Sequence, residues 1–164
     1  MQELPSGAPA TLGEAFGLIN ATTHPGIDVL KVMVLVEAAG KRLYEDLADQ
    51  VADPAVKALL CHNGREELAH AHRVARAIGA LTGSDYPVPA PDANPYLASP
   101  APARPVTAAM LNQLAAAEFG GEALYEHWAA NIGNPEAAAL FRQNGIEESE
   151  HGARLQQAAA LLGA

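Results

Sequence analysis

The sequence predicts an all-α protein, a four-helix bundle made of two similar helical hairpins, with a short additional helix near the N-terminus. Residues 37–73 and 118–154 align without gaps and are identical at fifteen of 37 positions. In each copy, apolar residues recur at helical spacing on both sides of a short turn. A proline-rich stretch separates the copies. Two hairpins joined by one long connection form a known bundle topology.

The first 25 residues are predicted to be an N-terminal segment with one short helix. Residues 1–10 are rich in Pro, Gly and Ala. Thr11 is a suitable N-cap for a helix that reaches about Asn20. His24-Pro25-Gly26 then interrupts the chain, and the bundle itself is expected over residues 26–164.

The first hairpin follows this break. One helix is predicted from Ile27 to about Ala52. Asp53 and Pro54 end it and begin the next helix, because Asp is a good N-cap and Pro suits the first helical position. The second helix is expected to run to about residue 78, just before Gly79.

Residues 81–105 are predicted to be an extended connection that returns the chain to the opposite end of the bundle. Prolines exclude a helix interior there, and they stand at Pro87, Pro89, Pro91, Pro95, Pro100, Pro102 and Pro105. Thr107 is a suitable cap for a third helix, which reaches about Ile132. Asn134-Pro135 repeats the Asp-Pro turn, and a fourth helix is expected to reach about Leu162.

Composition and charge narrow the classes of function. A formal charge of −9 argues against a nucleic-acid partner. No apolar run is long enough for a membrane span, and the N-terminal residues lack the pattern of a signal peptide. The single cysteine, Cys61, excludes an internal disulfide and a Cys-x-x-Cys metal site. We therefore expect a cytoplasmic protein.

A set of four polar residues occurs twice, 81 residues apart. Each set has the order Glu, Tyr at +7, Glu at +30 and His at +33. The members are Glu37, Tyr44, Glu67 and His70 in the first copy and Glu118, Tyr125, Glu148 and His151 in the second.

The spacing of these sets predicts a site for two metal ions. Glu37 and Glu67 lie at nearly the same height on either side of the turn at Asp53, since a mismatch of two residues is only about 3 Å of helix rise. The His three residues beyond the second Glu lies on the same helix face. Two facing hairpins thus offer four carboxylates and two imidazoles. Two divalent cations would neutralise four buried carboxylates, which otherwise repel one another. Mixed oxygen and nitrogen ligands suit iron or manganese, and zinc less specifically.

Further repeated residues are predicted to support this site. Tyr44 and Tyr125 share a helix face with Glu37 and Glu118, so their hydroxyls are expected to donate to a ligand carboxylate. Arg73 and Arg154, three residues beyond each His, are expected to pair with nearby acidic groups. One alternative stays open: Glu66 and Glu147 precede Glu67 and Glu148 directly, and a different helix register would exchange the two pairs.

These motifs resemble those of the ferritin-like di-iron carboxylate family, and within it the rubrerythrin branch. That pattern has Glu-x6-Tyr on the first and third helices and Glu-x-x-His on the second and fourth, and the resemblance covers roughly residues 26–162. It implies a ferritin-like four-helix bundle that holds two iron ions, with manganese as an alternative and zinc as a substitute. By this resemblance Glu67 and Glu148 bridge the metals, Glu37 and Glu118 are terminal ligands, and His70 and His151 each complete one coordination sphere.

The chain departs from that pattern in two ways. Rubrerythrins proper carry an additional glutamate where this chain has Gly121, and Glu122 stands about 100° further round the helix. The Cys-x-x-Cys rubredoxin domain that supplies electrons has no counterpart here. Electrons for any reaction are therefore expected from a separate donor.

The resemblance implies an oxidoreductase that oxidises Fe²⁺ with O₂ or H₂O₂, or that reduces peroxide, and we expect a homodimer. No protein nucleophile is needed for such chemistry. Two alternatives remain. The protein could bind or deliver iron without turnover, or it could be a metal-free helical interaction domain in which the duplicated motif is a relic.

Overall fold

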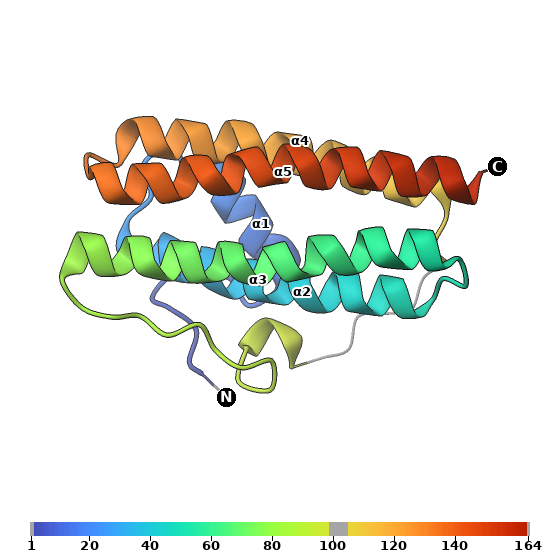
Figure 1. Cartoon of the computed structure of the whole chain (residues 1–164). Coiled ribbons are helices and arrows are strands. Elements are labelled where there is room, and N and C mark those ends of the chain that lie inside the picture. The colour runs from blue at the N-terminus through green and yellow to red at the C-terminus, as the bar shows by residue number, and fades with distance from the viewer. Residues whose placement is uncertain (1, 99–104, 164) are drawn as a thin grey trace.

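The computed structural model describes residues 2–98 and 105–163. All the regular secondary structure in these residues is helical, which confirms the predicted all-α bundle (Figure 1). The elements are α1 (Leu12–Ala21), α2 (Ile27–Asp49), α3 (Pro54–Thr82), the 3₁₀ helix η1 (Pro95–Leu97), α4 (Ala108–Asn131) and α5 (Pro135–Leu162). None of the described helices is long and apolar enough to cross a membrane.

The helices begin where polar side chains can cap them. Asp53 accepts hydrogen bonds from the backbone N–H groups of the first turn of α3, with a distance of 2.7 Å to Ala55 N. Asn134 caps α5 in the same way, and Thr11 and Thr107 cap α1 and α4. These side chains satisfy donors that a helix cannot pair internally.

Two predicted helix ends are wrong. The first helix of the bundle ends at Asp49, three residues earlier than expected. The second does not stop before Gly79 but continues to Thr82. Gly83 ends it instead, because this residue adopts the left-handed conformation, with φ 74°, that glycine takes without steric cost.

The two hairpins pack face to face, and each helix runs antiparallel to its counterpart in the other hairpin. Figure 1 shows α2 and α3 as one layer and α4 and α5 as the other, with α2 antiparallel to α4 and α3 antiparallel to α5. Two hydrogen bonds fix this direction, since Tyr44 donates to Glu118 and Tyr125 donates to Glu37. α1 lies behind the bundle and contacts α2. The loop after α1 accepts a hydrogen bond at Thr22 O from Trp128 Nε1, at 2.8 Å.

The connection between the hairpins runs along the outside of α2. Asn94 is buried and donates to the backbone oxygen of Leu35 at 2.8 Å, and the hydroxyl of Tyr96 donates to Pro9 O at 3.0 Å. The predicted extended connection therefore contains a 3₁₀ turn, η1, that packs on the bundle. The part of the prediction that falls on residues 99–104 lies outside the described residues.

The hydrophobic core is divided into two clusters. One holds Leu30, Leu35, Val74, Trp128 and Phe141 among others, and it lies beside α1 and the turn between α4 and α5. The second holds residues such as Leu60, Leu111 and Leu155 near the turn between α2 and α3. Buried carboxylates and imidazoles occupy the middle of the bundle between them.

Candidate metal centre

The bundle brings together all six residues that the spacing selected as metal ligands. Each of the four main helices contributes to the cluster. Five of the six residues are buried, and 12% of the Glu118 side chain is exposed to solvent. Their ligand atoms form three overlapping groups, and within each group the atoms lie within 4.8 Å of one another: Glu37, Glu67 and His70; His70, Glu148 and His151; and Glu67, Glu118, Glu148 and His151.

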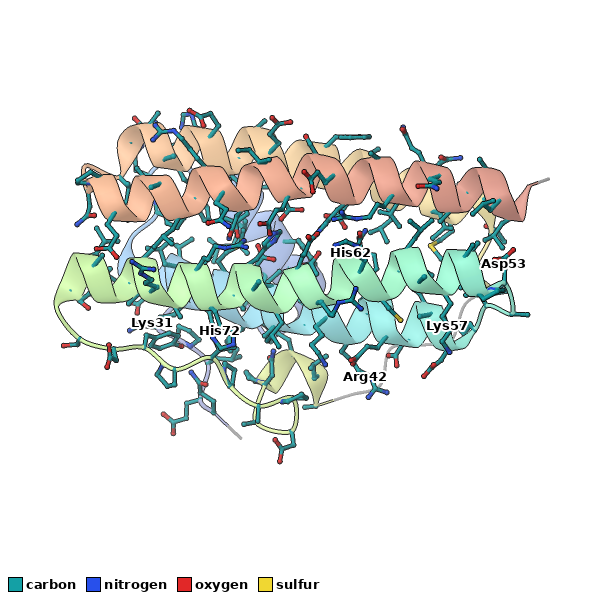
Figure 2. All side chains as sticks on the ribbon, in the orientation of Figure 1. Lys31, Arg42, Asp53, Lys57, His62 and His72 are labelled. Carbon is teal, nitrogen blue, oxygen red and sulfur yellow. The ribbon has the colours of Figure 1, made fainter. Side chains whose placement is uncertain are left out.

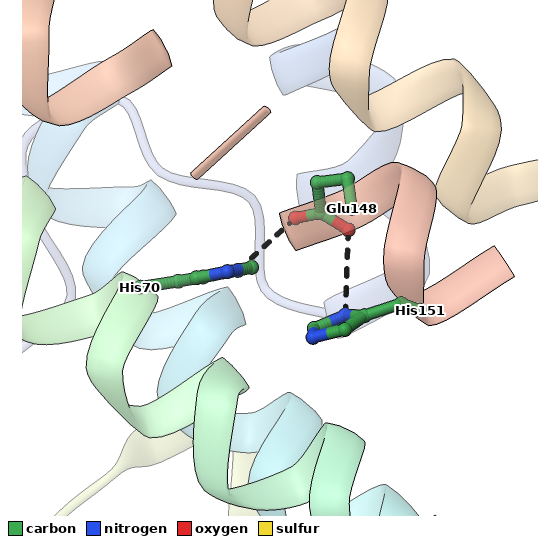
Figure 3. A group of neighbouring side chains, drawn as sticks. All are labelled: His70, Glu148 and His151. Atoms are coloured by element: carbon green, nitrogen blue, oxygen red, sulfur yellow. Dashed lines mark ion pairs between the residues drawn. The ribbon is translucent and has the colours of Figure 1, made fainter. Parts of the chain in front are cut away.

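Glu148 lies between the two imidazoles. Its Oε1 is 3.2 Å from Nδ1 of His70 and its Oε2 is 3.7 Å from Nδ1 of His151, as Figure 3 shows. Glu67 belongs to groups on both sides, and its Oε1 is 3.3 Å from Nδ1 of His151. The two rings are nearly parallel, with centroids 5.0 Å apart.

The outer nitrogen of each imidazole is held by a carboxylate from the opposite hairpin. Nε2 of His70 is 3.1 Å from Glu147 Oε2, and Nε2 of His151 is 3.1 Å from Glu66 Oε2. A carboxylate accepts here, so Nε2 carries the proton and donates it. Glu66 and Glu147 thus point away from the middle of the cluster, while Glu67 and Glu148 point into it. The helix register of the structure thus places Glu67 and Glu148, rather than Glu66 and Glu147, on the inner side of the cluster.

The inward nitrogens test whether the cluster fits metal ions. Nδ1 of His70 and Nδ1 of His151 are buried, and among the described residues neither has a hydrogen-bond partner. A buried nitrogen without a partner is costly, and both face carboxylate oxygens. Two divalent cations between these nitrogens and the four carboxylates would supply the missing partners. The residues present therefore fit a pair of metal ions.

The two tyrosines reach across the bundle. Tyr44 donates its hydroxyl hydrogen bond to Glu118, and Tyr125 donates to Glu37. The acceptor is a candidate ligand, as expected, but it lies on the opposite hairpin. Each tyrosine fixes the orientation of a carboxylate that the other half contributes.

The two arginines also bind the opposite hairpin. Arg73 contacts both carboxylate oxygens of Glu147 at 2.8 Å and donates to Asn144 Oδ1 at 2.9 Å. Arg154 donates to Asn63 Oδ1 at 2.6 Å and also to Glu66. The expected pairing with acidic groups is present.

Asn63 and Asn144 support the site and were not predicted to do so. They are fully buried. Each also donates to the backbone oxygen of a candidate ligand, Asn63 to His151 at 3.3 Å and Asn144 to His70 at 3.4 Å. Their recurrence in both copies could have indicated a role at the site. A repeated Asn next to a Gly is, however, equally compatible with close helix packing.

Two repeated glycines make room for the central carboxylates. A Cβ atom at Gly40 would stand 2.5 Å from Glu67 Oε2, and one at Gly121 would stand 3.0 Å from Glu148 Cγ. Glu122 does not replace a carboxylate at position 121, since it is exposed and accepts a hydrogen bond from Ser149.

The carboxyl groups of the cluster differ in the direction in which their surroundings shift the pKa. Burial, together with the charges of Glu37 and Glu118, raises the pKa of Glu67 and Glu148 well above the ordinary value. Burial opposes ionisation of Glu37 and Glu118 as well, but the nearby imidazoles of His70 and His151 lower the pKa of those groups.

Burial acts on the pKa of the His70 imidazole in the opposite direction, because the charged form of histidine is the protonated one. Burial alone would lower its pKa, but the surrounding carboxylates of Glu147, Glu148 and Glu37 raise the pKa of His70 to about 11. Without cations the central carboxyls and this imidazole therefore hold their protons more strongly than the same groups do in water. Divalent cations would take the place of those protons.

The fold and this cluster define a class of protein: a four-helix bundle with a buried centre of four carboxylates and two histidines that could hold metal. Residues 28–159 match the Rubrerythrin family model. The chain belongs to the Rubrerythrin family. Comparison with curated proteins and with solved structures gave no match.

Proposed function

We propose that the protein is a di-iron oxidoreductase that oxidises Fe²⁺ with O₂ or H₂O₂, or reduces peroxide. The observation that carries this proposal is the pair of buried, unpartnered Nδ1 atoms facing four carboxylates. Membership of the Rubrerythrin family supports iron as the metal. Manganese would suit the same ligands, and zinc could substitute for either.

Each half of the chain would supply one set of terminal ligands. Glu37 and His70 would hold one ion, Glu118 and His151 the other, and Glu67 and Glu148 would bridge them, since both reach the two sides of the cluster. Two bound ferrous ions would supply one electron each to the oxidant. A separate electron donor would return the centre to its reduced state.

The protein residues around the centre would hold it in one arrangement. Tyr125 and Tyr44 orient the carboxylates of Glu37 and Glu118 through hydrogen bonds. Glu147 and Glu66 keep the outer nitrogens protonated, so that the inner nitrogens are free to bind. The two hydrophobic clusters exclude water from either side.

The test begins with the metal content of protein purified without added metal. We expect about two ions per chain, and we expect a Glu67→Ala, Glu148→Ala variant to lose them. The matched control is Glu45→Ala, Glu126→Ala, because this pair also recurs in both copies but is exposed on the surface. The control should bind as the unmodified protein does. Absence of metal from the unmodified protein, even after reconstitution with Fe²⁺, would contradict the proposal and favour a metal-free interaction domain.

Rapid mixing of Fe²⁺-loaded protein with O₂ or H₂O₂ then tests the reaction. Oxidation of two ferrous ions per chain by either oxidant is expected. If neither oxidant reacts, the oxidoreductase proposal fails and the protein would bind or deliver iron without turnover.

A further inference from the structure

The two halves of the site differ in how the outer carboxylate is held. On the His70 side, Arg73 binds both oxygens of Glu147 at 2.8 Å. Gln143 adds a hydrogen bond from its amide nitrogen to Glu147 Oε1, at 3.3 Å. Glu147 is therefore held by a guanidinium and an amide, and burial, which would raise its pKa, is outweighed by His70 and Arg73, which lower the pKa to about 2.

On the His151 side, Arg154 is shared between two carboxylates, those of Glu66 and Glu150. Arg154 donates to Oε2 of Glu66, and its Nη1 is turned toward Glu150, at 3.6 Å from Oε2. The residue that corresponds to Glu150 in the first copy is Ala69, so Arg73 has no such competitor at that position. One oxygen of Glu66 is thus left to another donor.

His62 occupies that free oxygen. Its Nε2 is 3.1 Å from Glu66 Oε1, and 46% of its side chain is exposed. Figure 2 shows it on the side of α3 that faces α5. The corresponding residue in the second copy is Gln143. An imidazole exchanges protons with water near neutral pH, whereas an amide does not.

We propose that His62 is a positioning residue that makes the two metal positions unequal, by coupling the ion held by His151 to the proton concentration of the solvent. The coupling runs from His62 through Glu66 to the outer N–H of His151. This inference rests on the proposed two-metal site, and it concerns a residue that the proposed reaction does not itself require.

The physical basis is the charge that His62 adds when it binds a proton. A cation on Oε1 of Glu66 withdraws electron density from that carboxylate, which then accepts less strongly from His151, and the imidazole becomes a poorer metal ligand. The same cation also repels an incoming divalent ion. Both effects weaken binding on this side at acidic pH, and neither has a counterpart at Gln143.

The ion-paired charges around this position come from α5 and α3, and Arg65 also lies one helical turn beyond His62 on α3. On α5 they are Arg154 and Glu150, and on α3 it is Glu66. Among the residues that the structure describes, no α2 side chain forms an ion pair with His62. Of the differences between the two sides, the replacement of Gln143 by His62 is the one that puts an imidazole in place of an amide.

The experiment compares stepwise Mn²⁺ binding by titration calorimetry at about pH 6 and about pH 8, on either side of the usual range for histidine. In the unmodified full-length chain, we expect the ratio of the two binding constants to change between these pH values by on the order of tenfold. His62→Gln places the second copy's residue in the first copy and should abolish that change. Gln143→His should introduce a matching pH dependence on the other side.

Proton release gives a second readout. Titration in buffers of different ionisation heat counts the protons that leave on Mn²⁺ binding, and His62→Gln should release fewer at about pH 6 than the unmodified protein. His72→Gln is the matched control, since His72 is an exposed histidine of the same helix and should leave both readouts unchanged. Two Mn²⁺ ions bound by His62→Gln with the original ratio and proton count would overturn this inference alone. Failure of the unmodified protein to bind any metal would overturn the proposed function as well.

Discussion

At the scale of single residues, each candidate ligand depends on a neighbour from the other half of the chain. Tyr125 orients Glu37, and Glu147 holds His70, although these partners are 88 and 77 residues apart in sequence. Helix spacing could predict which residues share a face within one hairpin. It could not predict which side chain of the opposite hairpin each would meet, because that depends on how the two layers are placed against each other.

The glycines beside the central carboxylates allow a test at this scale. Gly40→Ala would place a Cβ atom 2.5 Å from Glu67 Oε2, so this carboxylate must move away from the centre. We expect metal affinity to fall by about 10–100-fold, the usual loss when the support of a ligand is disturbed. Calorimetric titration with Mn²⁺ measures the change.

Gly121→Ala is the matched control for this test. Its Cβ would stand 3.0 Å from Glu148 Cγ, a milder contact that a small shift relieves. The loss of affinity should be smaller than for Gly40→Ala. An equal or larger loss in Gly121→Ala would show that the closeness of the added Cβ atom to the carboxylate does not determine the loss of affinity.

At the scale of helices, the sequence predicted where each helix begins more accurately than where it ends. Asp53, Asn134, Thr11 and Thr107 each cap the helix they were expected to cap, because a side-chain oxygen near the first turn satisfies its free N–H groups regardless of the tertiary fold. A glycine near a helix end is ambiguous. Gly83, which takes a positive φ, ended α3, while Gly79 remained inside it.

The two caps at the hairpin turns should differ in strength. Asp53→Ala removes one cap, at the turn between α2 and α3 (Figure 2), and is expected to lower the free energy of unfolding by about 1 kcal/mol. Asn134→Ala removes an equivalent cap and also the hydrogen bond from Asn134 Nδ2 to Ala80 O, at 3.1 Å. This second loss adds about 1 kcal/mol. Urea denaturation of the metal-free proteins measures both, and a larger effect for Asp53→Ala would contradict the assignment.

At the scale of the whole molecule, the duplicated hairpin explains why the site could be predicted and also where it departs from symmetry. The ligands lie at matched heights because they are spaced equally about the two turns, so a cluster of carboxylates and imidazoles could be predicted, but spacing left the choice between Glu66 and Glu67, and between Glu147 and Glu148, open. The differences between the copies, such as His62 against Gln143, carry no signal until the layers are assembled and their neighbours are known.

The protonation of the metal-free centre makes the stability of the whole molecule depend on pH. The pKa of His70 in the fold, about 11, lies above its ordinary value of 6.5, so its contribution is complete below about pH 6.5 and is lost as the pH rises toward 11. Glu67 and Glu148, whose pKa values are also raised, lose their contribution as the pH rises above their ordinary value. Glu147 acts in the opposite sense, because its pKa of about 2 means that its contribution is present above 4.5 and is lost on acidification.

Metal ions and protons therefore compete for the same groups, and the stabilisation by metal should increase with pH. We expect saturating Mn²⁺ to raise the midpoint of thermal unfolding more at about pH 8 than at about pH 6, because at the lower pH a larger share of the binding free energy is spent on displacing protons from His70, Glu67 and Glu148. Thermal unfolding with a chelator and with excess Mn²⁺ at each pH measures the difference. The Glu67→Ala, Glu148→Ala variant should show no response to Mn²⁺ at either pH. A shift in the unmodified protein that is equal at both pH values would mean that metal binding displaces no protons from the buried cluster.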